Sequence, residues 1–569
     1  MKSFISLYIY KTNIIYIPIV FGILFFTGCS KSQMEFTPQD QISTSAFWKS
    51  SRDALLALNA CYGYLQYGYN YAYDDGKSDN AYAQYPWENT ATDISGGNIA
   101  PSLDAGYNSR YQSIRTLNYF LANIDKAPID EDTKNKYIAE VRAIRAFAYY
   151  ELAAIFGPVP LLKEAYNDPT ETAVEPTAQA DVINFAISEL QAVADNLPAS
   201  YPGGTGNETG RITKGAAWAM LTRIQLHFAK WADAAASAQK VMALGYQLFR
   251  VSSLTAADMS DDFSSFVTFT NDADKEKFYK GMASYEQQFW AANELTSKEI
   301  ILTSQSITNS SYEWGNGLNT LLPPSEIGGW SSITPTQSLV NSYWNRNGTA
   351  FTPASQETRA GNFNDGSSNA AFYAEFKNRD TRLYASVLFP SVTWNRYSDG
   401  FTFTWKSGIN NNNSKIGYNF RKLVDPAYTS TEWDGAQDFA IIRYAEVLLA
   451  YAEAKNEASG PDATIYAALD DIRDRAGMPA VDQSVYNTKD KLRELIRNER
   501  RIELAGEGQR YFDIRRWEIA GSVMTSIRDL NNSQVQERVW NDKYVLMPYP
   551  QTAVDKNPNL KAAQTTKGY

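Results

Sequence analysis

The densest group of side chains that could carry out catalysis lies between residues 497 and 516. Acids and arginines are interleaved there: Glu499, Glu503, Glu507 and Asp513, with Arg500, Arg510, Arg515 and Arg516. Pairs of carboxylates hydrolyse glycosidic bonds in many enzymes. In this segment, however, opposite charges recur at spacings of three and four residues, as they do in ion pairs along and between helices. We therefore interpret these acids as structural, and a surface glycoside hydrolase is the less favoured alternative.

Other catalytic or metal-binding patterns are weak. His227 is the one histidine, which excludes a site built from several histidines, and it lies in a stretch expected to be helical. No Gly-x-Ser-x-Gly, phosphate-loop or dinucleotide-binding pattern occurs. Asp74, Asp75 and Asp79 lack EF-hand spacing, so a solvated loop is the default interpretation and calcium binding is left open. We expect a protein that is not an enzyme and needs neither a cofactor nor a metal site.

Aromatic residues favour a binding function. They make up 14% of the chain, with 37 tyrosines and 13 tryptophans. Their flat apolar faces and polar tips match sugar rings, which have apolar C–H faces and hydroxyl rims. An aromatic residue in a helical stripe already has a role in the core, so the candidates for glycan contact are tryptophans in predicted loops. These are Trp87, in a predicted loop over residues 74–107, and Trp314 and Trp330, in an irregular central region.

The N-terminus predicts export and a lipid anchor. Lys2 and Lys11 precede an apolar run over residues 14–26, which leads into Thr27-Gly28-Cys29. A run of about 13 residues is shorter than the roughly 20 needed to span a bilayer as a helix, so we expect residues 1–28 to be cleaved. Small residues before a cysteine resemble the bacterial lipobox, in which the cysteine is acylated. An ordinary signal peptide, with Cys29 incidental, is the alternative.

Charge and cysteine content narrow the remaining possibilities. The whole chain has a net charge of −10, and removing residues 1–28 takes away two lysines, leaving 51 basic and 63 acidic residues and a net charge of −12. A nucleic-acid partner is therefore not expected, and a neutral or weakly charged ligand fits better. Cys61 is the one other cysteine, so with Cys29 acylated no internal disulfide is expected.

Hydrophobic periodicity predicts a mainly α fold. Helical stripes cover residues 45–62, 107–124, 134–156, 177–197, 211–245 and 443–476. The last two stretches each hold two helices over a length near the 34-residue tetratricopeptide period. We expect tetratricopeptide-like helix pairs in a superhelical scaffold, with long irregular loops and a few short β-strands, including runs near residues 299–302 and 401–405.

Motifs in the last third of the chain carry a family resemblance. The main ones are Ile-Arg-Tyr-Ala-Glu-Val-Leu-Leu at residues 442–449, Ile-Arg-Asn-Glu-Arg-Arg-Ile-Glu-Leu at residues 496–504, and Met-Pro-Tyr-Pro at residues 547–550. Earlier matches lie at residues 156–160, 334–337 and 378–383. Together they resemble the SusD/RagB outer-membrane nutrient-binding proteins over nearly the whole mature chain.

The resemblance implies a lipoprotein acylated at Cys29 that binds glycan and delivers it to a SusC-like TonB-dependent transporter. It also implies a location at the cell outer membrane, facing the exterior, although the acidic cluster often found after the cysteine is reduced here to Glu35. RagB-like relatives are associated with peptide uptake, so a peptide cargo is an alternative.

The predicted organisation is a signal peptide at residues 1–28, a lipidated tether at 29–45 and a single SusD-like domain at 46–569. This domain comprises an N-terminal helical half (46–250), a loop-rich ligand region (251–438) and a C-terminal helical part (439–569).

Overall fold

The computed structural model describes residues 47–66, 68–166, 168–201, 208, 210–308, 314–364, 369–408, 412–428 and 433–569. The predicted signal peptide, Cys29 and the tether lie outside these residues. Every helix in these residues is too short or too polar to span a bilayer. Cys61 is buried as a free thiol.

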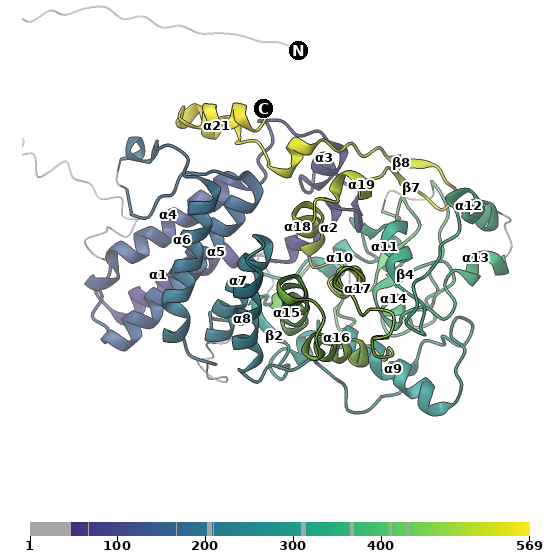
Figure 1. Cartoon of the computed structure of the whole chain (residues 1–569). Helices are drawn as coiled ribbons and strands as arrows, with labels where there is room; N and C mark the ends of the chain where they lie inside the picture. The colour runs from purple at the N-terminus through teal and green to yellow at the C-terminus, as the bar shows by residue number, and fades with distance from the viewer. Residues whose placement is uncertain are drawn as a thin grey trace, which may run out of the picture.

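Stacked helices form one side of the molecule (Figure 1). In order they are α1 (Ser51–Cys61), α4 (Tyr107–Asn123), α5 (Glu131–Phe156), α6 (Gln179–Val193), α7 (Lys214–His227) and α8 (Trp231–Met242). The stack continues into α15 (Tyr444–Ser459), α16 (Ala463–Arg475) and α17 (Lys489–Glu503), because α15 packs against α8 as well as against α16 and α17. The predicted mainly helical fold with stacked helix pairs is confirmed.

Local signals set the ends of these helices. Asp130 caps α5 by accepting a hydrogen bond from the Thr133 N–H at 2.8 Å. The same helix ends at Gly157, whose φ of 76° only glycine adopts easily, and Pro158 follows. Thr213 caps α7 in the same way through the Ala216 N–H. Each capping side chain bonds to a backbone N–H only three residues away, so the sequence alone indicates where the helices begin and end.

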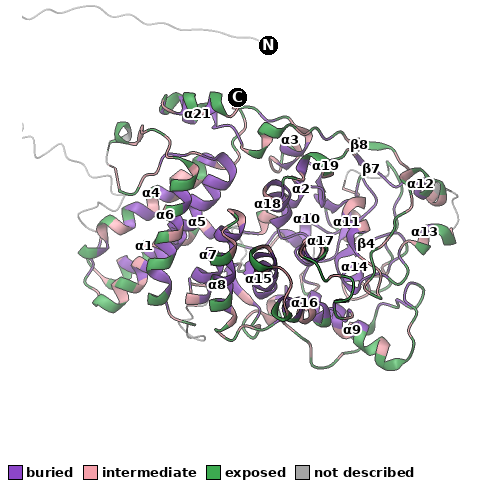
Figure 2. Cartoon of the chain, in the orientation of Figure 1, coloured by how far each residue is buried: buried purple, intermediate pink, exposed green. Residues whose placement is uncertain are grey.

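The other side of the molecule consists of short elements and long connections. Its helices are α2 (Ala72–Gly76), α3 (Ala91–Gly96), α9 (Asp272–Gln287), α10 (Leu318–Leu321), α11 (Gln337–Ser342), α12 (Gln356–Asn364), α13 (Ala370–Ala374), α14 (Thr381–Ser386), α18 (Gln509–Arg516) and α19 (Ala520–Val523). Figure 2 shows buried residues continuing from the stacked helices into this side, and one hydrophobic core joins the two. The C-terminal helices α20 (Gln551–Lys556) and α21 (Leu560–Thr566) lie instead beside the stacked helices (Figure 1), where Lys567 donates to the Phe156 carbonyl at 3.3 Å.

The described strands form four two-stranded antiparallel pairs. They are β1 (Ala81–Ala83) with β3 (Ile333–Pro335), β2 (Ile300–Ser304) with β6 (Phe439–Arg443), β4 (Val387–Leu388) with β5 (Asn419–Phe420), and β7 (Ile527–Arg528) with β8 (Gln534–Gln536). Two of these pairs, β1 with β3 and β2 with β6, join segments more than 100 residues apart, so short strands connect distant parts of the chain.

Two local predictions need correction. The predicted loop at residues 74–107 contains β1, α3 and the end of α2, because β1 finds its partner β3 about 250 residues later. The β-like run at residues 401–405 does not form a regular strand, and Thr402 makes an isolated antiparallel bridge to Thr393. Backbone hydrogen bonds join residues 391–394 to residues 401–403, and Ser391, where φ is 74°, departs from the extended backbone that a longer strand would need.

Candidate functional site

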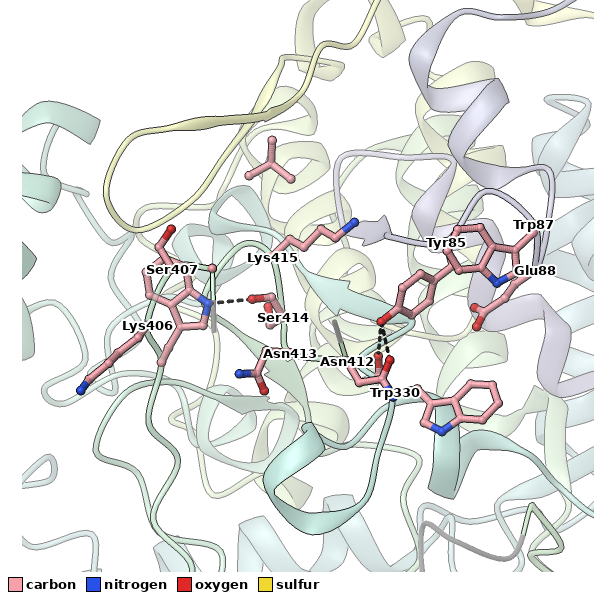
Figure 3. A pocket seen from close by; sticks show the side chains of 13 residues that line it. Tyr85, Trp87, Glu88, Trp330, Lys406, Ser407, Asn412, Asn413, Ser414 and Lys415 are labelled. Atoms are coloured by element: carbon pink, nitrogen blue, oxygen red, sulfur yellow. Dashed lines mark hydrogen bonds between the residues drawn. The ribbon is translucent and has the colours of Figure 1, made fainter. Parts of the chain in front are cut away.

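A hollow of about 940 Å³ opens on the side of the molecule built from short elements (Figure 3). Its walls come from residues 85–88, from Trp330, from the described parts of residues 405–415 and from Val535. These segments are far apart in the sequence. The site therefore exists only where the tertiary structure brings them together.

Gln84 joins the segment that follows β1 to the two other main segments of the hollow, those around Trp330 and around residues 413–415. It follows β1, its side chain is buried, and its Nε2 donates to the Trp330 carbonyl at 3.3 Å and to the Asn413 carbonyl at 3.2 Å. Its Oε1 accepts a hydrogen bond from the Lys415 backbone N–H at 3.2 Å. The pairing of Ala83 with Ile333 sets the Trp330 segment beside the residues that follow β1. One buried amide thus satisfies backbone groups from two distant loops.

Exposed aromatic faces dominate the hollow. Trp87 has 77% of its surface exposed and Trp330 has 39%. The centre of the Tyr85 ring lies 5.0 Å from that of Trp87, and its hydroxyl donates to Asn412 Oδ1 at 3.0 Å while lying 3.3 Å from the Trp330 carbonyl. The Trp330 ring also packs against Trp433, with ring centres 5.0 Å apart. Large exposed apolar faces that are fixed by neighbouring side chains are typical of ligand-binding surfaces.

The structure brings two of the three predicted tryptophans together. Trp87 and Trp330 line the same hollow. Trp314 is 42% exposed but lines a separate hollow of about 280 Å³, with Tyr62 and Gln66 among its neighbours.

Several lining residues were not predicted from the sequence. Tyr85 stands two positions before Trp87 in the same segment, which is a signal that could have identified it. Asn412 and Asn413 belong to a run of asparagines recognised only as a loop. Trp405 is buried and forms part of the wall, with its Nε1–H donating to the Ser414 carbonyl at 2.7 Å. Nothing local in the sequence marks Lys406 or Lys415 as site residues.

The charged groups of the hollow differ in their environments. The exposed lysines Lys406 and Lys415 form no ion pair with any acid in the described parts of the chain. The Lys415 ammonium lies 5.7 Å from the centre of the Tyr85 ring. Glu88 accepts hydrogen bonds from the Tyr73 hydroxyl at 2.7 Å and from Ser332 at 3.1 Å, and burial raises its pKa. The lysines are therefore the freely available charges.

The acids considered for hydrolysis lie elsewhere, inside a buried ion network. Glu503 is fully buried and pairs with Arg443 at 2.8 Å, with Arg382 at 3.1 Å, and with Arg475. Glu499 is also buried and pairs with Arg382 at 2.8 Å. Burial alone would raise the pKa of Glu503, but the surrounding arginines lower it well below its usual value. Neither acid lines the hollow, and each has the fixed partners expected of a structural ion pair.

The remaining chemical candidates also have structural partners. Burial, together with the field of nearby arginines, lowers the pKa of the partly buried His227 to about 3, so the ring is neutral at physiological pH. Asp79 pairs with Arg501 at 2.8 Å and with Arg510 at 2.7 Å. Asp74 pairs with Lys77. Among the described residues, no group of three or more potential ligands is placed to hold a metal ion.

Comparison with known proteins identifies the family. The family model described as the SusD family matches residues 298–569, and one described as starch-binding and associating with the outer membrane matches residues 55–226. The chain belongs to the SusD/RagB family. SusD-family proteins are non-catalytic binding proteins, and the second description associates the family with the outer membrane.

Individual relatives extend the match over most of the SusD-like chain. It is 24% identical to a SusD-like protein of Formosa agariphila, over 90% of this chain and 92% of that one. A SusD-like carbohydrate-binding protein of Bacteroides fragilis superposes with a TM-score of 0.73 at 26% identity, covering 90% of this chain and 99% of that one. A surface glycan-binding protein of Bacteroides thetaiotaomicron, solved with laminarihexaose, shares the fold with a TM-score of 0.60 at 17% identity, covering 89% and 98%.

Proposed function

We propose that this SusD-like protein binds glycan chains in the hollow formed by Trp87 and Trp330 and delivers them to a SusC-like TonB-dependent transporter. The observation that carries the proposal is the exposure of these two indoles within one hollow that also contains amide side chains. Relatives described as carbohydrate-binding or solved with a glucan oligosaccharide support it.

The geometry suits recognition without chemistry. The C–H face of a sugar ring can lie on an exposed indole, while Asn412 and Asn413 offer groups that exchange hydrogen bonds with hydroxyls. The hollow is about 940 Å³, which is large enough for several sugar rings. Because Tyr85, Gln84 and Trp433 already hold the two tryptophans in place, little ordering is needed when the ligand binds.

Tryptophan substitutions test the site. We expect Trp87→Ala and Trp330→Ala each to weaken oligosaccharide binding by about tenfold, corresponding to about 1.4 kcal/mol, the scale of an aromatic hot-spot residue. Isothermal titration calorimetry against a panel of oligosaccharides measures the effect. Tyr119→Ala is the matched control, because Tyr119 is an exposed aromatic residue on α4 outside the hollow. Unchanged affinity in both tryptophan variants would place the glycan site elsewhere.

Trp314 remains a proposed glycan contact of a different kind. It belongs to the smaller hollow near Tyr62, so we assign it an accessory role. Trp314→Ala should reduce affinity for long chains and leave the binding of short oligosaccharides to the Trp87 hollow unchanged. An equal loss for short and long ligands would argue against separate contacts.

We further propose that Cys29 carries the lipid anchor and that the mature protein faces the cell exterior. Intact-protein mass spectrometry should find an acylated N-terminal cysteine, and Cys29→Ser should release the protein from the membrane fraction. Protease added to intact cells should digest an outward-facing protein. Crosslinking in native membranes, followed by identification of the captured protein, tests the transporter partner; recovery of no TonB-dependent transporter would count against delivery.

The same experiments also test the two alternative functions, peptide binding and glycan hydrolysis. Binding of peptides but of no glycan would reassign the cargo while keeping the architecture. Turnover of a glycan that is abolished by Glu499→Gln without loss of stability would restore the hydrolase interpretation.

A further inference from the structure

We call the hollow lined by Trp87 and Trp330 the glycan hollow. The charge around it is opposite in sign to the net charge of the whole protein. The chain carries a net charge of −10, yet the charged residues that line the hollow are Lys406, Lys415 and Glu88. Glu88 is held by Tyr73 and Ser332, whereas both lysines are exposed. Local potential follows the groups that face a cavity and not the net charge of the molecule. An acidic protein therefore presents positive charge at this site.

A second hollow, of about 520 Å³, lies among α11, α12, α17 and the segment leading into β7. We call it the arginine hollow, because its charged lining residues in the described chain are Arg359, Arg501 and Arg528, with no acid among them. Most of the other lining residues carry hydroxyl or amide groups, among them Ser338, Asn341 and Gln356. Such a surface is suited to a polar, negatively charged ligand.

Two of these arginines already have carboxylate partners, because Arg359 pairs with Glu375 at 2.7 Å and Arg501 with Asp79; Arg528 is exposed and has no ion-pair partner among the described residues. Asp79 accepts from both Arg501 and Arg510. Arg538 is also close enough to lower the pKa of Asp79, so three guanidinium groups surround one carboxylate. In addition, Asn498 lines the arginine hollow, and its Nδ2 is buried without a hydrogen-bond partner. An oxyanion in the hollow would supply the missing charge and an acceptor.

The same two parts of the chain, the β7–β8 pair and residues 330–336, contribute lining residues to both hollows. Arg528 of β7 lines the arginine hollow, whereas Val535 of the paired strand β8 lines the glycan hollow. Trp330 and Thr336 likewise line one hollow each, and the six residue steps between them span at most about 20–22 Å. A single polysaccharide chain is long enough to contact both.

We propose that the cargo is a negatively charged glycan, bearing carboxylate or sulfate groups, and that the arginine hollow is a second contact site for the same chain. This inference rests on the proposed glycan-binding function and specifies its substrate class. It replaces the expectation of a neutral or weakly charged ligand, which was drawn from net charge alone.

Affinity measurements with defined polymers test the substrate class. Polygalacturonate supplies carboxylates, chondroitin sulfate supplies both carboxylates and sulfates, and laminarin and starch are neutral. We expect at least one acidic polymer to bind about tenfold more tightly than the neutral ones at about 0.01 M salt, and to lose most of that advantage at about 0.15 M, where the Debye length falls from about 30 to about 8 Å. Tighter and salt-independent binding of a neutral polymer would overturn the inference but keep the proposed function. Binding of no glycan at all would overturn the proposed function itself.

Charge-removing variants test the two sites separately. The double variant Lys406→Gln, Lys415→Gln should weaken the binding of both short and long acidic ligands several-fold. Arg528→Gln should weaken only long chains, because a disaccharide or trisaccharide cannot reach from one hollow to the other. Arg528 is exposed, and within the described chain its side chain hydrogen-bonds to the nearby Asn532 carbonyl alone, so the fold should tolerate the change.

Matched controls complete the experiment. Lys561→Gln and Arg52→Gln remove exposed positive charges from α21 and α1, two helices that contribute no lining residue to either hollow, and should leave affinity unchanged. Equal losses in these controls would show a nonspecific charge effect and overturn the inference. Full retention of long-chain affinity in Arg528→Gln would overturn the second contact site.

Discussion

Replacing Glu503 with glutamine is the sharpest test of the buried ion network. The carboxylate is surrounded by the guanidinium groups of Arg382, Arg443 and Arg475, and all four side chains are fully or almost fully buried. Glutamine keeps the shape but removes the negative charge, so three buried cations lose a shared partner. Breaking a buried ion pair by removing one partner costs about 3–5 kcal/mol. That is a large fraction of the roughly 5–15 kcal/mol that stabilises a typical folded protein.

The effect should depend on pH in a defined direction. The pKa of Glu503 is depressed in the folded protein, so its stabilising effect is fully present above its unfolded value of about 4.3. It is lost as the pH falls below that value towards the folded pKa. The difference in unfolding free energy between the wild-type protein and Glu503→Gln should therefore be constant near neutral pH and narrow in acid.

Urea unfolding, followed by circular dichroism at several pH values, measures this difference. Glu131→Gln is the control, because Glu131 is exposed and its pair with Lys134 is worth at most about 1 kcal/mol. The folded fraction of Glu503→Gln should bind glycan with wild-type affinity, since Glu503 does not line the glycan hollow. A variant as stable as the wild type, or one that is stable but no longer binds, would refute this reasoning.

Three further predictions follow from other contacts. Because burial lowers the pKa of His227 to about 3, stability should decrease as the pH falls from about 6.5, and His227→Gln should reduce that dependence in the same unfolding assay; an unchanged slope would contradict it. Gly281→Ala should destabilise the protein by about 1–3 kcal/mol in thermal unfolding, because a Cβ would lie 2.5 Å from the backbone of Ala476; wild-type stability would contradict it. In a double-mutant cycle, the losses of binding free energy for Trp87→Ala and Trp330→Ala should not add, because both residues contact one ligand; strict additivity would indicate independent sites.

Local patterns in the sequence predicted the helical part of the fold correctly. The helix pair expected at residues 211–245 corresponds to α7 and α8, and the pair expected at residues 443–476 corresponds to α15 and α16. Helix periodicity and caps depend on residues within a few positions of each other, so they can be recognised without knowing the tertiary structure. The structural role of Glu499 and Glu503 was also inferred from the spacing of charges, but their partners Arg382 and Arg443 were not, because those residues lie on distant segments.

The glycan hollow shows what the sequence alone could not predict. Composition and predicted loops identified Trp87, Trp314 and Trp330 alike as candidates, and the fold places Trp314 in a different hollow from the other two. Whether exposed aromatic residues meet depends on β1 pairing with β3 and on the long-range hydrogen bonds of Gln84.

The charge at the site also depends on the tertiary structure as well as on the sequence. The sequence by itself determined the helices, the net acidity and the kinds of side chain available for binding. Only the tertiary structure decided that lysines and arginines face the two hollows, because the position of a side chain on a surface depends on contacts between segments hundreds of residues apart.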